Sequence, residues 1–237
     1  SLVLLIYFTV HKNKRFVYLV FAILFILSML YTGSKGPLLA LVVTYIMYLI
    51  LINKFFNKKL FTLFLMFLVI SSIVTFVLPE NEVFARFTDL DLNDKTFQER
   101  ILLMNLGLQA FVDNPLIGQG LGGYSLFAFG VDERLYPHNI IIELMAEFGV
   151  MGLAIFLVIV IILLTTIKTI YLSNNCNKEL LMAIPAVFIF YLINSLVSGD
   201  IIGNLELFIC SVMLIIINKQ LKSKESMTND KKYKNIV

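Results

Sequence analysis

Long apolar runs alternate with short polar stretches along most of the chain. A helix needs roughly 20 residues to cross about 30 Å of hydrocarbon, and six runs come close to that length. We predict each of them as a membrane-spanning helix, because backbone groups in lipid have to be hydrogen-bonded within the segment itself. The six predicted spans are residues 16–32, 37–52, 60–78, 150–167, 180–197 and 201–217. A further run at residues 2–10 is too short to span, and we expect it to be the last part of a helix that begins earlier.

The composition points to the same class of protein. Apolar residues make up 59% of the 237 residues and charged residues only 15%, whereas soluble domains average about 25% charged residues. With 21 Phe, 10 Tyr and no Trp, the aromatic residues suit lipid-facing helices with Tyr at the membrane interface. The predicted fold class is therefore an all-α, polytopic transmembrane helix bundle with one long extracytoplasmic loop containing short helices.

The basic residues indicate how this bundle is oriented. If the loop at residues 11–15 is cytoplasmic, alternating sides places 14 of the 19 Lys and Arg residues inside and five outside. The five outside are Lys35, Arg86, Lys95, Arg100 and Arg134. This asymmetry is typical of a multi-pass protein of the cell membrane. The net charge of +3 follows from this topology and from a lysine-rich tail against anionic lipid, so no nucleic-acid partner is expected.

The spans form two blocks with one long polar segment between them. We divide the chain into residues 1–78, a partial first span and three helices; residues 79–149, an extracytoplasmic loop; residues 150–218, three more helices; and residues 219–237, a basic cytoplasmic tail. A long loop flanked by short ones is where function usually concentrates.

Local signals divide this loop further. Thr96 and Glu99 have the spacing of a capping box, and apolar residues follow as far as Asp113-Asn114-Pro115. We therefore predict a helix at residues 96–112, lying near the membrane surface. A glycine-rich turn is predicted at residues 115–124.

A second helix of the loop is predicted to begin after Tyr136-Pro137-His138-Asn139. Its apolar pattern continues into the span that follows. Gly149 and Gly152 are expected to break or tighten this helix where it enters the bilayer.

Five short motifs follow one another across this part of the chain. They are Gly33-Ser34-Lys35-Gly36, Glu99-Arg100, Asn114-Pro115-Leu116-Ile117-Gly118-Gln119-Gly120, His138-Asn139 and Ala146-Glu147-Phe148-Gly149-Val150-Met151-Gly152. In order, spacing and place in an external loop, they resemble the motifs of the O-antigen ligase and O-antigen polymerase superfamily. Members usually have more spans than this chain, so the resemblance implies that it is the C-terminal half of a member.

The resemblance implies an integral-membrane glycosyltransferase that acts on polyprenyl-diphosphate-linked glycans outside the cytoplasmic membrane. Its implied partners are this donor, a glycan or lipid acceptor, membrane lipids, and the chain-length regulator and flippase proteins of the same process. The bond to the diphosphate supplies the energy for transfer, so no nucleotide or other cofactor is expected. Such chemistry uses cationic groups for the leaving diphosphate and a base for the attacking hydroxyl.

Four basic residues are candidates for binding the diphosphate. Arg100 is the first, because arginine pairs with phosphate oxygens bidentately and stays charged; the alternative is a solvated arginine on a surface helix. Lys35 lies at the membrane face between two spans, where the family usually has Arg, so it keeps the charge without the bidentate fork. Arg86 and Arg134 are weaker candidates, since loop arginines are commonly only soluble charge.

His138 is one of two His residues in the chain, and the usual His pKa of about 6.5 suits proton transfer. Two roles stay open for it, a general base for the acceptor hydroxyl and a donor to the diphosphate; a lone loop histidine is more often a surface or capping residue. Asn139, Glu143 and Glu147 follow at helical spacing. From the family motif, Asn139 is predicted to contact substrate and Glu147 to orient His138 or contact sugar hydroxyls as a catalytic residue. Glu143 is expected on a polar face turned towards the loop.

Gly118 and Gly120 suit a tight turn whose backbone approaches lipid or sugar, with a purely structural turn as the alternative. The glycine cluster lacks the preceding strand and the following Lys-Ser/Thr of a nucleotide-binding loop. Cys176 and Cys210 fall in different compartments, so neither a disulfide nor a metal site is expected.

Within the superfamily we favour a polymerase that joins oligosaccharide repeats into O-antigen, capsule or exopolysaccharide. The first alternative is a ligase that transfers the glycan to lipid A-core or another acceptor, because the motifs serve both activities. A polysaccharide transporter or flippase is an alternative from another class, but transporters place polar residues at the membrane midplane, and these spans are nearly free of them. A third is a scaffold subunit without catalytic activity.

Overall fold

The computed structural model describes residues 2–3, 5–6, 15–31, 35–52, 95–173 and 178–234, and every regular element within these ranges is a helix. The predicted all-α class is therefore confirmed for the described residues. The chain divides into two compact units, Ser1–Phe97 and Gln98–Val237. The predicted span at residues 60–78 lies outside the described residues, as does Arg86.

The first unit contains two apolar helices that pack against each other, α2 (Arg15–Tyr31) and α3 (Lys35–Leu51). Each has 17 residues and lies at the place of one of the first two predicted spans, and that they cross a membrane stays a prediction. Within α3, Tyr48 is fully buried and Ile50 is exposed, so this helix has one buried and one exposed apolar side.

The second unit contains the remaining helices, of which three segments are apolar and long enough to cross a membrane. These segments are Ile140–Leu172, Lys178–Ser195 and Ile202–Ser223, and they agree with the last three predicted spans. The helices are α6 (Lys95–Asp113), α7 (Gly123–Phe129), α8 (Ile140–Leu172), α9 (Lys178–Leu181), α10 (Ala183–Ser195), η1 (Ile202–Asn204) and α11 (Leu205–Lys234). Because α11 continues to Lys234, the predicted basic tail begins as helix.

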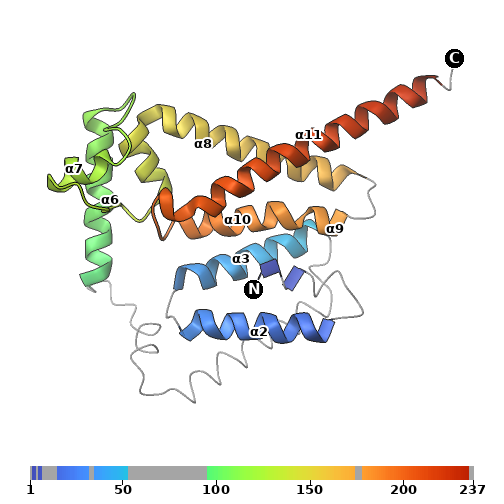
Figure 1. Cartoon of the computed structure of the whole chain (residues 1–237), viewed down its shortest axis with the longest axis horizontal. Coiled ribbons are helices and arrows are strands. Elements are labelled where there is room, and N and C mark those ends of the chain that lie inside the picture. Colours follow the sequence, from blue (N-terminus) through green and yellow to red (C-terminus); the bar gives the residue numbers. More distant parts are fainter. Residues whose placement is uncertain are drawn as a thin grey trace. The chain divides into compact units, whose positions relative to one another are not determined.

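The long helices α8, α10 and α11 run side by side and share one apolar core (Figure 1). Phe188 of α10 and Leu214 of α11 are fully buried in it, together with Leu163 of α8. The outward side chains of α8, such as Ile155 and Leu164, are exposed and apolar. Such a surface is stable against lipid chains and would be costly against water.

A kink at Gly149 divides α8 into two parts. The whole helix has 33 residues, about 50 Å at 1.5 Å per residue, which exceeds the roughly 30 Å of a bilayer core. The uncharged part after the kink, residues 150–167, is long enough to span by itself. The part before the kink carries Glu143 and Glu147, and we treat it as lying outside the membrane-spanning segment.

Helix α6 lies across one end of the bundle of long helices, next to the first part of α8 and to α7 (Figure 1). Its bounds agree with the predicted helix at residues 96–112 to within one residue at each end. Ala110 of α6, Tyr124 of α7 and Ala146 of α8 form a buried cluster that holds the three helices together. Helix α7 was not predicted; it follows the glycine-rich turn, where the sequence indicates only a linker.

Candidate functional site

Three backbone hydrogen bonds join the glycine-rich turn to α8 at its kink. Gly149 takes φ 60° and ψ −147°, so the regular hydrogen bonds of the helix are interrupted there. The three bonds run from Gln119 N to Ala146 O (2.9 Å), from Gly120 N to Glu147 O (2.9 Å) and from Val150 N to Pro115 O (2.8 Å). The turn thereby satisfies backbone groups that the kink leaves free, which fixes the direction of the first part of α8.

Two positions where the glycine-rich turn meets the kink of α8 require glycine, because the backbone of the turn and the backbone of α8 approach each other closely. A Cβ on Gly118 would lie 2.3 Å from the carbonyl carbon of Glu147, and a Cβ on Gly149 would lie 2.5 Å from the Pro115 carbonyl oxygen. The N–H groups of Gly118 and Gly120 donate to carbonyls of Asn114 and Glu147. The structural role of this turn is therefore evident, while substrate contact by Gly118 and Gly120 stays a prediction.

Glu147 connects α8 with the start of α7. Its side chain is buried, and backbone N–H groups of Gly122 and Tyr124 hydrogen-bond its carboxylate. The hydroxyl of Tyr124 in turn donates to the carbonyl of Leu103 in α6 at 2.8 Å. Glu147 thus ties α8 to the start of α7, and Tyr124 ties α7 to α6; the predicted catalytic role of Glu147 stays a prediction.

The beginning of α8 is tied to the segment between α10 and η1. The Asn139 side chain caps α8 by accepting from the N–H groups of Ile141 and Ile142, and its Nδ2 donates to the carbonyl of Leu196 at 3.0 Å. Substrate contact by Asn139 is not tested by these bonds and stays a prediction.

Glu143 is not on a face turned towards the loop, contrary to what its spacing indicated. It is 4% exposed, and both carboxylate oxygens accept from the N–H of Ile201, at 3.1 and 3.0 Å. The reason is tertiary: the turn before η1 packs onto α8 and offers an unpaired N–H, which the carboxylate satisfies.

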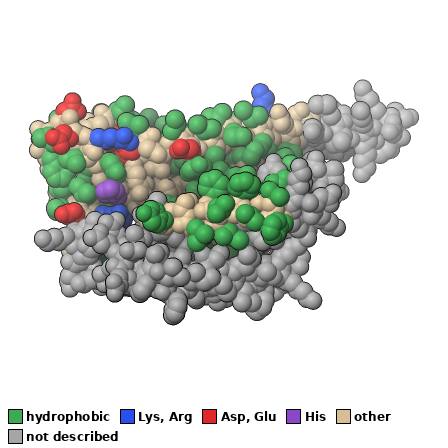
Figure 2. All heavy atoms as spheres, turned by 60° about the horizontal axis from the view of Figure 1, so that its bottom comes forward, with side chains coloured by type: hydrophobic (Ala, Val, Ile, Leu, Met, Phe, Trp, Pro, Cys, Tyr) green, Lys and Arg blue, Asp and Glu red, His purple; other side chains and the backbone are tan. Residues whose placement is uncertain are grey.

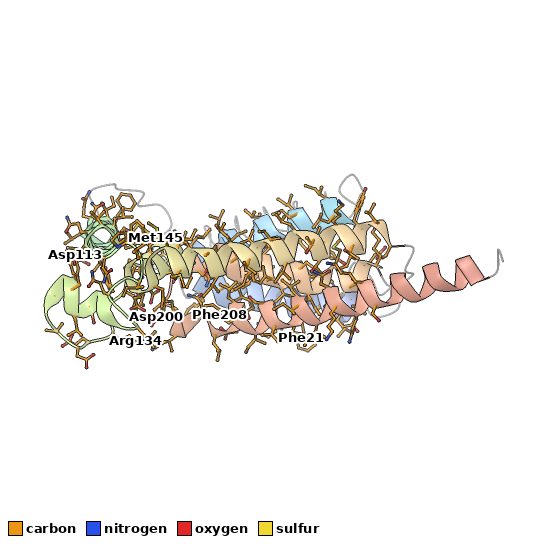
Figure 3. The ribbon with its side chains drawn as sticks, turned by 90° about the horizontal axis from the view of Figure 1, so that it is seen from above. Phe21, Asp113, Arg134, Met145, Asp200 and Phe208 are labelled. Atoms are coloured by element: carbon orange, nitrogen blue, oxygen red, sulfur yellow. The ribbon has the colours of Figure 1, made fainter. Side chains whose placement is uncertain are left out.

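Arg134 and Asp200 form a two-point ion pair that joins the same two regions. Arg134 Nε and Nη2 donate to Asp200 Oδ2 and Oδ1 at 2.5 and 2.7 Å. Figure 3 shows the two side chains next to each other at one end of the long helices. The hydrogen bond from Arg134 lowers the pKa of Asp200, against the opposing effect of burial, and the same bond raises the pKa of Arg134. The carboxylate is therefore ionised throughout the physiological pH range.

His138 has two features typical of functional sites. Its φ of 55° makes it the one non-glycine residue with positive φ among the described residues. Its Nδ1 is buried, and no described residue hydrogen-bonds it, although the Tyr136 ring packs edge-on with centroids 4.5 Å apart. Strained backbone and unpaired buried polar atoms cluster where a protein binds or transforms a ligand.

Arg100 of α6 lies close enough to His138 for its charge to act on the imidazole. Burial is the main cause that lowers the pKa of His138 below 6.5, the positive charge of Arg100 adds to it, and Asp200 opposes it. His138 is consequently mostly neutral at pH 7, able to accept a proton. Figure 2 shows that most of the charged side chains on the visible face gather at one end of the described part of the molecule.

Two further predicted diphosphate ligands, Lys35 and Arg86, do not belong to the described part of the second unit. Lys35 is the first residue of α3 and belongs to the first unit, and Arg86 lies outside the described residues. Their roles stay predictions. Within the described ranges, no three His, Cys, Asp or Glu side chains lie close enough together to hold a metal ion.

Asp200 is the one charged residue of this arrangement that the sequence did not single out. Its partner lies 66 positions away, and no local pattern indicates such a pairing. The one sequence feature that could have indicated Asp200 is its place in the short polar turn between two predicted spans. A carboxylate that is buried in such a turn needs a partner of opposite charge.

A family model described as O-antigen ligase matches residues 20–157, which is more than half of the chain and includes Arg100 and His138. No curated protein and no solved structure gives a significant match.

Proposed function

Because this chain belongs to the O-antigen ligase family, we propose that it is an integral-membrane glycosyltransferase whose donor is a polyprenyl-diphosphate-linked glycan. The first candidate activity is polymerisation, in which oligosaccharide repeats are joined into a surface polysaccharide such as O-antigen, capsule or exopolysaccharide. The reaction takes place at the extracytoplasmic face, at the end of the bundle that carries α6 and the first part of α8. Chain-length regulator and flippase proteins are the partners expected for this process.

The arrangement of His138 and Arg100 supports this proposal most directly. A cation that stays charged lies within electrostatic reach of a mostly neutral imidazole, at the end of three apolar helices. Glycosyl transfer from a diphosphate needs both groups, one for the negative charge that develops on the leaving group and one for the proton of the attacking hydroxyl.

The proposed reaction is a displacement at the anomeric carbon of the donor. The hydroxyl oxygen of the acceptor forms a bond to this carbon, while the bond from the carbon to the diphosphate oxygen breaks and its electron pair stays on the polyprenyl diphosphate. The hydroxyl proton passes to the neutral His138 and then to solvent. Arg100 stabilises the charge on the leaving diphosphate, and Lys35 and Arg86 are further candidates for this role.

Asn139, Glu147, Gly118 and Gly120 contribute in this proposal through the shape of the site. Asn139 caps the helix that begins directly after His138, and Glu147 and the two glycines hold that helix against α6 and α7. Preorganised groups of this kind lower the barrier without reorganisation during the reaction.

A second candidate activity is ligation, the transfer of a finished glycan to lipid A-core or another acceptor. The description of the matching family model favours it. The chemistry at the donor is the same in both cases, and only the acceptor differs.

The test uses the purified protein in lipid nanodiscs with lipid-linked repeat units as the only glycan. A polymerase gives a ladder of products, and a ligase gives a product only when lipid A-core or a protein acceptor is added. Arg100→Gln and His138→Asn are expected to lose either product, while Lys168→Gln, at the opposite end of α8, retains it. Wild-type amounts of product from both site variants, or a failure only of glycan export in cells, would contradict the proposal and favour a transporter.

A further inference from the structure

The ion pair of Arg134 and Asp200 is asymmetric in its exposure. The Asp200 side chain is 7% exposed, whereas the Arg134 side chain is 62% exposed. Removing two charges from water costs stability that a buried pair often does not recover, and a pair with an exposed guanidinium adds only a little, so fold stability alone does not account for this pair. The pair therefore holds a cation at the surface.

Asp200 is itself fixed by the turn that contains it. Its Oδ1 also accepts from the N–H of Gly203 at 2.7 Å, and its carbonyl accepts from Nδ2 of Asn204 at 2.8 Å. Asn204 is buried as well. Because the carboxylate has a single position, the guanidinium that it binds at two points also has one.

The guanidinium keeps a free edge in this position. Arginine has five N–H groups, and Asp200 takes one on Nε and one on Nη2. No described residue accepts from the other three, which lie on Nη1 and Nη2. Two of these N–H groups on neighbouring nitrogens match the spacing of two phosphate oxygens.

Arg134 lies four residues before His138 in the chain, and its partner Asp200 connects it with the surroundings of the imidazole. Asp200, which binds Arg134, acts on the imidazole electrostatically, as does Arg100 from another helix. A diphosphate carries more than one negative charge, and one arginine does not balance it.

We propose that Arg134 is a further ligand of the donor diphosphate and that Asp200 is the residue that positions it. This inference rests on the proposed function, because it adds a second guanidinium to the same site. An arginine already ordered by its partner loses little conformational entropy when the phosphate binds.

The test measures binding of a short-chain polyprenyl diphosphate to the full chain in nanodiscs by calorimetry. Arg134→Gln is expected to raise the Kd about tenfold or more, and Arg134→Lys, which keeps the charge without the fork, about threefold to tenfold. Lys168→Gln serves as the matched control for loss of one positive charge and leaves the Kd unchanged. Wild-type Kd values for both Arg134 variants would overturn the inference.

Positioning by Asp200 is tested by a double-mutant cycle. Asp200→Asn raises the Kd when Arg134 is present and has no further effect in an Arg134→Gln background. A loss of fold would instead act equally in both backgrounds, which would overturn the positioning role. Gly203→Ala is a second variant that leaves both charges in place: its Cβ would lie 2.5 Å from Asp200 Oδ1 and 3.4 Å from Arg134 Nη2, so it is expected to resemble Asp200→Asn.

The same measurement separates this inference from the proposed function. If Arg100→Gln weakens binding and the Arg134 variants do not, only the role of Arg134 is overturned. If neither the wild type nor any variant binds the diphosphate, the proposed function fails and the inference fails with it.

Discussion

At the scale of single residues, His138 holds a backbone conformation that non-glycine residues rarely adopt. The left-handed region costs an L-residue roughly 1–2 kcal/mol, and the unpaired Nδ1 adds a desolvation cost. Glycine or asparagine would fill this position with less strain. A residue that carries such a local cost is often one whose side chain has a function.

Replacing His138 by Asn separates this task from the backbone, because asparagine tolerates positive φ. We expect His138→Asn to keep the thermal stability of the wild type and to lower the transfer rate by about 10²- to 10⁴-fold, the usual contribution of a general base. Rates measured with a lipid-linked donor check this expectation.

The pH profile follows from the groups that face the imidazole, which are Arg100 from α6 and Asp200 from the turn before η1. Burial and Arg100 lower the pKa of His138 below 6.5, so activity is expected to fall as the pH drops through that lowered value and the base becomes protonated. Arg100→Gln removes one cause of the lowering, and the acidic limb of its residual activity moves to higher pH. An acidic limb that persists unchanged in His138→Asn would assign it to another group.

Among the elements, the contact between the glycine-rich turn and the kink of α8 sets the direction of the first part of α8, which precedes the predicted span. Two glycines of the turn differ in a useful way. Gly118 and Gly120 both have positive φ, but a Cβ on Gly118 meets the backbone of Glu147, whereas a Cβ on Gly120 meets no atom within 4 Å.

We expect Gly120→Ala to cost about 1–2 kcal/mol of stability, the strain of positive φ alone. Gly118→Ala adds a collision with backbone atoms that have no room to move, and its total cost is roughly 3 kcal/mol or more. Thermal unfolding in detergent measures both variants. Equal losses for the two would show that the turn does not pack on α8 in this way.

Local sequence signals predict the elements of this region correctly where a single stretch of residues decides them. The capping box and Asn114-Pro115 bound α6, and Gly149 marks the kink, because each acts on its own neighbours. Helix α7 was not predicted, because its seven residues between Gly122 and Gly130 are too few to show a helical periodicity of apolar residues. The bonds of Glu143 with Ile201 and of Arg134 with Asp200 depend on how α8 and α10 pack, which no local pattern contains.

At the scale of the whole molecule, polar side chains of the second unit gather at one end, whereas its long helices are apolar. His138, Arg134 and Asp200 lie at the end where α8 begins, while Lys168 and Lys178 belong to the later part of α8 and to α9. The positive-inside rule predicts that the first end lies outside and the second in the cytoplasm.

Labelling of single cysteines checks this orientation in cells. In a background of Cys176→Ser and Cys210→Ala, a membrane-impermeant maleimide is expected to label Glu133→Cys in intact cells. It labels Lys222→Cys only after the membrane is opened; both positions are exposed in the structure. The reverse pattern would place the site on the wrong side for a lipid-linked glycan donor.

In the proposed mechanism, Arg100 stabilises the diphosphate that leaves the donor while His138 receives the proton. Single-turnover release of polyprenyl diphosphate in nanodiscs measures this step directly. We predict that Arg100→Gln slows release by about 100-fold or more, as removal of a group that stabilises transition-state charge does, while Lys168→Gln leaves it unchanged. Release by Arg100→Gln at the wild-type rate would contradict the account.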